Sequence, residues 1–136
     1  GEASGVSENV VGRPFVGPAG KLLDHILERA WQGQVSYCLT NLVCCLPLES
    51  DGSKATEPYD EQVLACAPRL QEMVRIANPK LIVCVGSLAW GYVRFKVVPC
   101  VQIVHPAAIL RMPLAQKQMA VQKVIVVLLN AVENML

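Results

Sequence analysis

Residues 79–87 of the chain have the sequence PKLIVCVGS. A proline and a lysine precede five consecutive apolar residues at positions 81–85, and Gly86 and Ser87 follow them. A short apolar run bounded by turn residues is typical of a strand that is buried on both faces of a parallel sheet. The glycine-serine pair predicts a turn into a helix after this strand. The stretch therefore indicates an α/β fold.

Helical and extended patterns alternate along the rest of the chain. Over residues 20–31, apolar residues recur every three or four positions, which predicts an amphipathic helix. Thr56 is a candidate N-cap for a second helix, in which Pro68 should cause a kink or a restart. In full, helices are expected over 20–31, 56–77 and 114–136, and strands over 35–45, 81–85 and within 97–104. Such alternation predicts a parallel sheet.

The composition is that of a single globular domain. The chain has 136 residues, of which 53% are hydrophobic and 17% are charged, so intrinsic disorder is excluded. No apolar run reaches the roughly 18 residues of a membrane-spanning helix, so we expect no membrane segment. The net charge of +1 does not indicate a strongly basic nucleic-acid binder. Any contact with DNA must therefore be local.

The six cysteines do not form the pattern of a secreted disulfide framework. Cys44 and Cys45 are adjacent, and Cys84 lies inside the apolar run, where a small thiol packs well. A reducing cytoplasm is the expected location, and some of the cysteines are candidate metal ligands.

Polar residues at the carboxyl ends of parallel strands are candidates for ligand binding. The Asn41 amide offers a donor and an acceptor that match a pyrimidine edge, although an asparagine can equally satisfy nearby backbone groups. His105 follows the last expected strand and could donate to a developing negative charge, although a lone histidine is more often structural.

A loop rich in proline and glycine precedes the first helix. It has the sequence GRPFVGPAG over residues 12–20 and contains Phe15, one of two phenylalanines. A flat base could stack on this ring, or the ring could instead pack the loop onto the core. The preceding turn, GEASG at residues 1–5, has neither the spacing of a phosphate-binding loop nor that of a nucleophile elbow.

Taken together, these segments resemble the family 4 uracil-DNA glycosylases, including the related domains of phage polymerase-associated type. The matching motifs follow in order along nearly the whole chain: GEASG at 1–5 with Glu8, GRPFVGPAG at 12–20, LLD at 22–24, TNLVCC at 40–45, PKLIVCVG at 79–86 and HPAAILR at 105–111. The resemblance implies a three-layer α/β/α sandwich with a parallel four-stranded sheet. It also implies DNA repair by base excision, in which uracil is flipped out of DNA and its N-glycosidic bond is hydrolysed to leave an abasic site.

The resemblance assigns roles to individual residues. Phe15 would stack on the uracil, Asn41 would read its polar edge, and His105 would donate to its O2 as the base departs. Glu2 and Glu8 match acidic positions near the sugar and the attacking water, where carboxylates stabilise an oxocarbenium-like sugar. Catalysis is thus expected from Glu2, Glu8 and His105.

The expected partner is uracil-containing DNA. Arg111, Arg13 and the start of the helix at Pro106 would face its phosphates. We expect a monomer in the cytoplasm of a bacterial or phage-infected cell.

The resemblance also implies a [4Fe–4S] cluster held by four cysteines, which the chemistry itself does not require. Cys45 and Cys66 match two of the ligands, whereas the N-terminal CxxC pair is absent from this sequence. The first strand of the sheet is absent as well. We therefore expect residues 1–136 to be one N-terminally incomplete glycosylase-like domain, which alone could be inactive.

Two other functions remain open. A catalytically degenerate relative would bind DNA or a partner without releasing the base; Ser4, Cys44 and a shortened segment near residues 91–101 favour it. A nucleotide-binding α/β domain with no DNA role would not bind DNA even at low salt, where phosphate contacts are strongest.

Overall fold

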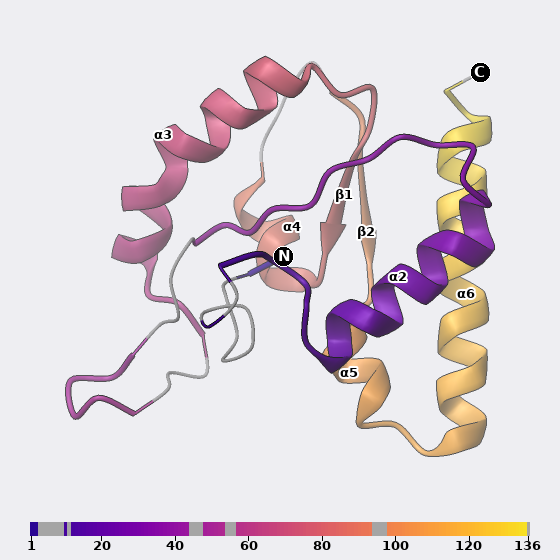
Figure 1. The fold of residues 1–136 in the computed structure, drawn as a ribbon, viewed down its shortest axis with the longest axis horizontal. Coiled ribbons are helices and arrows are strands. Elements are labelled where there is room, and N and C mark those ends of the chain that lie inside the picture. Colours follow the sequence, from indigo (N-terminus) through magenta and orange to yellow (C-terminus); the bar gives the residue numbers. More distant parts are fainter. Residues whose placement is uncertain (3–9, 11, 44–47, 54–56, 94–97, 136) are drawn as a thin grey trace.

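The structure is a computed structural model that describes residues 1–2, 10, 12–43, 48–53, 57–93 and 98–135. Labels follow Figure 1. The elements are α2 (Pro18–Trp31), α3 (Asp60–Ala77), β1 (Ile82–Val85), α4 (Ser87–Tyr92), β2 (Cys100–Ile103), α5 (Pro106–Leu110) and α6 (Leu114–Glu133). The predicted α/β class is confirmed. Among the described helices, none is long and apolar enough to cross a membrane.

The two strands form a parallel pair. Their register places Ile82 beside Cys100 and Val85 beside Ile103. The ladder continues past β1, because the Gly86 N–H donates to the Ile103 carbonyl at 2.9 Å. Both strands therefore end at the same edge of the sheet. The residues that follow them, Gly86 and His105, lie at this edge.

Helices cover both faces of the pair. Side chains of β1 alternate between two hydrophobic cores, with Val83 and Val85 on one side and Ile82 and Cys84 on the other. The first core also contains residues of α2, α5 and α6, and the second contains residues of α3 and α4. Figure 1 shows the strands between these two groups of helices. This layering agrees with an α/β/α sandwich.

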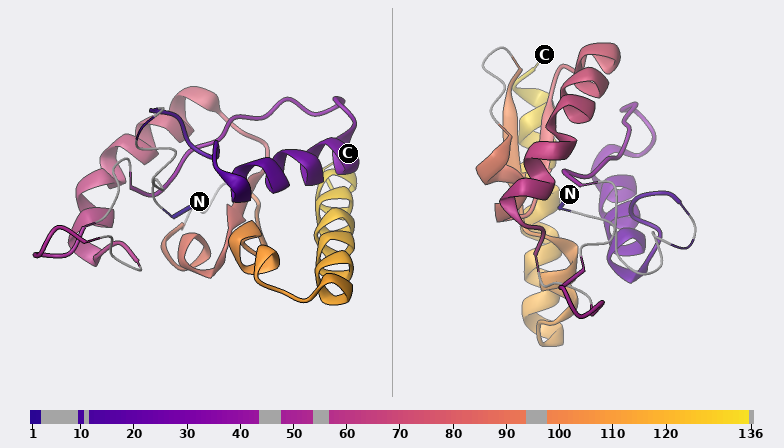
Figure 2. Two further views of the ribbon diagram at one scale, coloured as in Figure 1. Left: turned by 60° about the horizontal axis from the view of Figure 1, so that its bottom comes forward. Right: turned by 90° about the vertical axis from the view of Figure 1, so that its left-hand side faces the viewer.

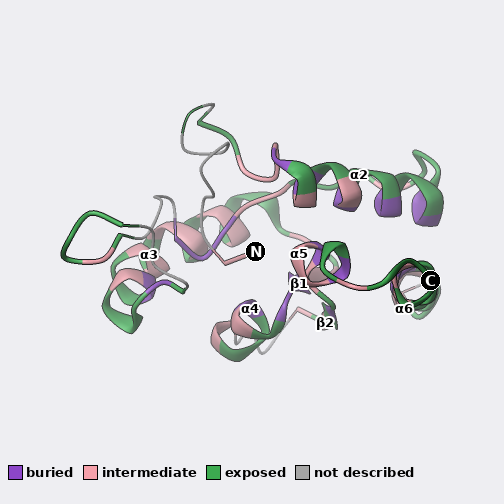
Figure 3. Cartoon of the chain, turned by 90° about the horizontal axis from the view of Figure 1, so that it is seen from below, coloured by how far each residue is buried: buried purple, intermediate pink, exposed green. Residues whose placement is uncertain are grey.

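The larger core lies between α2 and α6. Ile26 and Leu128 are fully buried there, and the Trp31 indole N–H donates to the Leu128 carbonyl at 3.4 Å. Figure 3 shows the buried residues of α2 along the face that is turned toward α5 and α6. The helical spacing of apolar residues over α2 thus predicted its buried face correctly.

The strand expected over residues 35–45 is not present over its described part. Residues 35–42 belong to no strand, Tyr37 is 51% exposed, and Val43 makes a single bridge. The apolar residues at the end of the segment, Leu42 and Val43, are buried. However, a strand also needs a hydrogen-bonding neighbour along its length. Within the described residues the sheet has two strands, β1 and β2.

The helix expected over residues 56–77 begins later. Thr56 lies outside the described residues, and α3 starts at Asp60 with Tyr59 as its N-cap. The Tyr59 N–H donates to the Gln62 side chain at 2.8 Å, which satisfies a backbone donor at the helix start. Pro68 neither ends nor restarts α3. Leu64, whose carbonyl loses its donor there, is 67% exposed, so water can replace the lost hydrogen bond.

Candidate active site at the carboxyl ends of the strands

The loop before α2 holds Phe15 in one conformation. Phe15 has φ +58, a left-handed value that is uncommon for a residue with a side chain. Its backbone lies directly on α2, since a Cβ at Gly20 would come within 2.0 Å of the Phe15 carbonyl oxygen. Only glycine at position 20 permits this approach. The GRPFVGPAG motif therefore fixes where the Phe15 ring points.

Gly1 separates the Phe15 ring from the Asn41 amide. A Cβ on Gly1 would lie 2.6 Å from both the Phe15 Cζ and the Asn41 Oδ1. The aromatic ring and the amide therefore approach the same backbone unit from two sides. The predicted stacking residue and the predicted edge-reading residue thus lie together, although 26 positions separate them in the sequence.

Backbone hydrogen bonds hold the N-terminal residues against the Asn41 segment. Gly1 donates to the Thr40 carbonyl at 2.9 Å, and its own carbonyl accepts from the Leu42 N–H at 3.0 Å. The Val43 N–H donates to the Glu2 carbonyl at 3.0 Å. The first two bonds have the pattern of a parallel bridge centred on Asn41. The two views in Figure 2 show the N-terminus inside the ribbon, between α3 and α2.

His105 caps α5 with its side chain. The Nδ1 atom accepts a hydrogen bond from the Ala107 N–H at 3.0 Å. An imidazole that accepts at Nδ1 and is neutral carries its proton at Nε2. The cap therefore selects the tautomer in which Nε2 is a hydrogen-bond donor.

The surroundings of His105 favour its neutral form. Burial lowers the pKa of the imidazole from 6.5, and the positive charge of Arg111 lowers this pKa further. Gly86, at φ +96, lies against the ring, since a Cβ there would be 3.3 Å from the His105 Cβ and Cδ2. A neutral donor is thus held at the carboxyl ends of β1 and β2.

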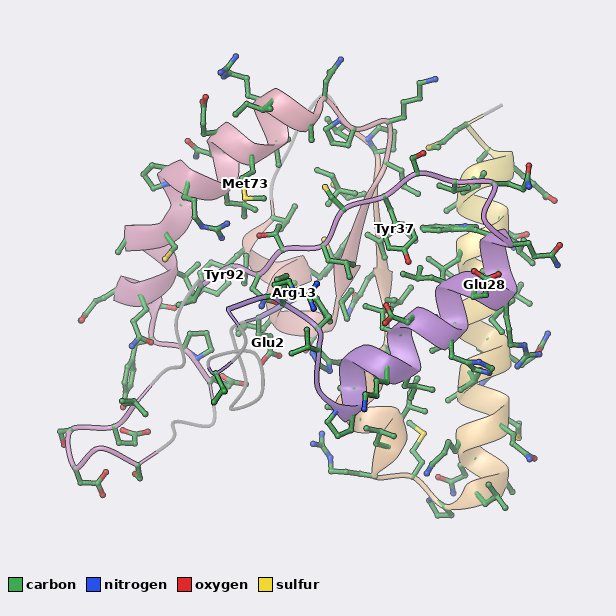
Figure 4. The ribbon with its side chains drawn as sticks, in the orientation of Figure 1. Glu2, Arg13, Glu28, Tyr37, Met73 and Tyr92 are labelled. Carbon is green, nitrogen blue, oxygen red and sulfur yellow. The ribbon has the colours of Figure 1, made fainter. Side chains whose placement is uncertain are left out.

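Glu2 lies next to this group of residues and is half-buried. Burial raises the pKa of its carboxyl from 4.5, and the nearby Glu57 raises it further. Figure 4 shows Glu2 in the region between α3 and α2. Glu8, the other expected acidic residue, lies outside the described residues.

Arg69 of α3 is a contact that the sequence did not indicate. Its guanidinium donates to the Asn41 carbonyl at 2.5 Å and to the Thr40 hydroxyl at 3.0 Å. No motif or spacing singles out this arginine, because it lies in the middle of an otherwise ordinary amphipathic helix.

The residues expected to contact DNA differ in exposure. Arg13 and Arg111 are exposed, and Arg111 acts electrostatically on His105. By contrast, the side chain of Pro106 is fully buried at the first position of α5. A phosphate contact there cannot involve the proline ring and must come from the neighbouring backbone.

The described residues do not form a site for an iron–sulfur cluster. Cys66 lies on α3 and packs against the core of Leu42, Val63 and Cys84. Cys45 lies outside the described residues, and in the described part no three His, Cys, Asp or Glu side chains gather as a metal site would require. Of the two expected cysteine ligands only Cys66 is among the described residues, and one cysteine does not make a four-cysteine cluster site.

Comparison with known protein families identifies the family of this chain. The model of the uracil-DNA glycosylase superfamily matches residues 1–129. The chain belongs to this superfamily. Several relatives carry the name type-4 uracil-DNA glycosylase. The protein from Pyrobaculum aerophilum is 38% identical over 89 residues, covering 65% of this chain and 43% of that protein. The protein from Saccharolobus solfataricus is 34% identical over 93 residues, covering 68% and 41%.

The relative from Archaeoglobus fulgidus is 30% identical over 140 residues, covering 83% of this chain and 66% of that protein. The chain thus matches less than half the length of the first two relatives. The predicted membership in the uracil-DNA glycosylase superfamily is confirmed.

Proposed function

We propose that the protein excises uracil from DNA by hydrolysing the N-glycosidic bond of a flipped nucleotide. The observation that carries this proposal is the state of His105, a neutral imidazole whose Nδ1 is occupied by the Ala107 N–H. Such a side chain can present only a donor at Nε2. Phe15 and Asn41, which lie together, supply the surface and the edge that a flat pyrimidine needs.

Base recognition in this proposal belongs to Phe15 and Asn41. The Phe15 ring stacks on the face of the uracil, a contact that accepts any base. Selectivity comes from the Asn41 amide, which donates to one uracil oxygen and accepts from the ring N–H. Asn41 is 8% exposed, and its carbonyl is held by Arg69, so the amide has a fixed place beside the Phe15 ring.

His105 acts on the departing base. When the bond between the sugar and the base breaks, its electron pair leaves with the uracil, and negative charge accumulates at O2. A fixed Nε2–H donor stabilises that charge more in the transition state than in the ground state. Because His105 stays neutral, it stabilises the uracil anion without having to transfer a proton first.

Glu2 and Glu8 are assigned to the sugar and the attacking water. Positive charge develops on the sugar as the base departs, and a carboxylate nearby stabilises it. A carboxylate can also accept the proton that water loses as it forms its bond to the anomeric carbon. The raised pKa of the Glu2 carboxyl makes it a stronger base than a free glutamate.

The partner in this proposal is uracil-containing DNA, bound by a monomer. Arg13 and Arg111 contact its phosphates, and the backbone at the start of α5 contributes beside Pro106. These are a few local contacts, in keeping with a net charge of +1.

Cys45 and Cys66 are proposed as ligands of a [4Fe–4S] cluster in the protein expressed from its complete gene. Iron and sulfide analysis of the purified protein tests this directly. Replacing Cys66 with serine should lower the iron content, and unchanged iron would contradict the assignment.

Uracil release from a single-uracil oligonucleotide tests the function, with abasic sites detected by alkaline cleavage. The protein expressed from its complete gene is compared with its His105→Ala and His105→Asn variants. Asparagine can still accept the Ala107 N–H and so preserves the helix cap, but it cannot extend a donor to the base. Both variants should release uracil about 10²- to 10³-fold more slowly.

Two results would contradict the proposal. If the folded wild-type protein binds uracil-containing DNA but releases no base, it is a binding protein and not an enzyme. If His105→Asn retains wild-type activity while His105→Ala does not, the histidine serves only as a helix cap.

A further inference from the structure

We infer that Arg69 is a positioning residue that sets the orientation of Asn41 and thereby the selectivity for uracil. This inference rests on the function proposed above. Arg69 lies in α3, outside the sequence motifs that carry the family resemblance. Arg69 contacts both the Asn41 carbonyl and the Thr40 hydroxyl.

The guanidinium of Arg69 bridges two consecutive residues of that segment. Its Nη2 donates to the Asn41 carbonyl at 2.5 Å, and its Nη1 donates to the Thr40 Oγ1 at 3.0 Å. The Nη1 atom also lies 2.8 Å from the Met73 sulfur, one turn further along α3. Figure 4 shows Met73 on the side of α3 that faces this segment. A planar fork with several donors suits this task, because it fixes two acceptors at once.

Asn41 is held on both sides of its backbone as a result. Arg69 binds its carbonyl from the α3 side, while Gly1 binds the Thr40 carbonyl and the Leu42 N–H. Its side-chain amide takes part in none of these hydrogen bonds. A side chain that discriminates between bases must be held in one position. Hydrogen bonds that fix the Asn41 backbone hold its amide in this way.

The position of Arg69 is unfavourable for stability alone. Its Nε is buried without a hydrogen-bond partner among the described residues. In the same part of the chain it has no carboxylate partner, and the ion pair found there joins Arg75 to Glu72 instead. A partly buried cation without a counter-ion costs free energy. Such unfavourable placements are expected for residues that position a functional site.

A double-mutant cycle between Arg69 and Asn41 tests the inference. Single-turnover uracil release is measured for the wild type, Arg69→Met, Asn41→Ala and the double variant, each expressed from the complete gene. Methionine keeps the length of the side chain and removes its donors. Arg69→Met should slow release by about 10- to 100-fold in the wild-type background, because small misplacements of a binding group have effects of this size. In the Asn41→Ala background the same change should slow it by less than about threefold.

Base selectivity provides a second readout that a purely structural role would not change. Free uracil and free cytosine, which differ at the edge that Asn41 reads, are compared as inhibitors. The preference for uracil over cytosine should fall by about tenfold in Arg69→Met, because a loosened amide can present either its donor or its acceptor. Arg75→Met is the matched control, since it removes an exposed arginine of the same helix and should leave both readouts unchanged.

The outcomes separate this inference from the function on which it rests. If the wild type releases no uracil, the proposed function fails and the inference fails with it. If the wild type is active but Arg69→Met has the same effect in both backgrounds, or leaves the base preference unchanged, only the inference is overturned. Circular dichroism establishes whether each variant folds. Should Arg69→Met not fold, Arg69→Lys replaces it in the cycle, because lysine keeps the charge but cannot bridge both acceptors.

Discussion

At the scale of single residues, the helix cap formed by His105 also sets which nitrogen of its ring carries the proton. Its Nδ1 completes the start of α5, and this same bond leaves Nε2 as a donor. Burial and nearby positive charge lower the pKa of the ring, so the neutral form persists below the pH at which a free histidine is protonated. The cap thus determines which chemistry the side chain can perform.

We predict that His105 titrates below its ordinary pKa of 6.5. Because the folded-state pKa is lowered, stability that is present above pH 6.5 is lost as the pH falls through the folded pKa. NMR titration of the imidazole measures both the pKa and the tautomer. The chain has two histidines, so His25→Gln leaves a single ring to observe. A midpoint above 6.5, or a proton at Nδ1, would contradict the assigned state.

At the scale of elements, α2 supports the site through its first turn. Gly20 lies where the Phe15 backbone crosses the helix, and Pro18 occupies the first helical position. The other face of α2 is buried against α5 and α6. The helix therefore connects the Phe15 loop (residues 12–20) to the larger core, so a change in its first turn affects Phe15 directly.

Replacing Gly20 with alanine should both destabilise the protein and slow uracil release. The new Cβ would meet the Phe15 carbonyl oxygen at 2.0 Å, and a backbone atom cannot move aside as a flexible side chain can. We expect a loss of about 1–3 kcal/mol in the free energy of unfolding, measured with urea. Gly91→Ala is the control, because a Cβ at this position of α4 meets nothing within 4 Å. It should be neutral or stabilise by up to ~1 kcal/mol. Equal effects of the two changes would exclude the close contact as the cause.

At the scale of the whole molecule, nearly equal numbers of basic and acidic residues limit how DNA can be bound. There are 12 basic and 11 acidic residues, so no general positive field attracts the phosphates. The exposed Arg111 lies close enough to His105 to affect its pKa. Binding should therefore depend on individual cations at the edge that holds His105.

We predict that Arg111→Gln weakens DNA binding and makes it less sensitive to salt. Each phosphate contact contributes roughly one unit to the slope of log affinity against log salt concentration, so the slope should fall by about one. Fluorescence anisotropy with a uracil-free oligonucleotide, between about 50 and 200 mM salt, measures this slope. Arg29→Gln serves as the control, because Arg29 is exposed and lies in the last turn of α2, whereas the Phe15 loop adjoins the first turn. A slope that is unchanged in Arg111→Gln would remove Arg111 from the DNA interface.

The sequence by itself determined which elements form over most of the chain. Apolar periodicity identified α2 and α6, and the apolar runs identified β1 and β2, because these patterns depend on residues that are close in the sequence. The motifs also identified Phe15, Asn41 and His105 as candidates. The strand over residues 35–45 was wrong over its described part, because composition supplies β propensity but not a neighbouring strand.

Only the tertiary structure decided how these residues meet. Gly1 joins Phe15 to Asn41, the α5 cap selects the His105 tautomer, and Arg69 binds the Asn41 carbonyl. Each contact joins a side chain to backbone atoms whose direction depends on the path of the chain. No local pattern encodes those directions, since burial, pKa shifts and hydrogen-bond geometry arise only once distant segments are packed together.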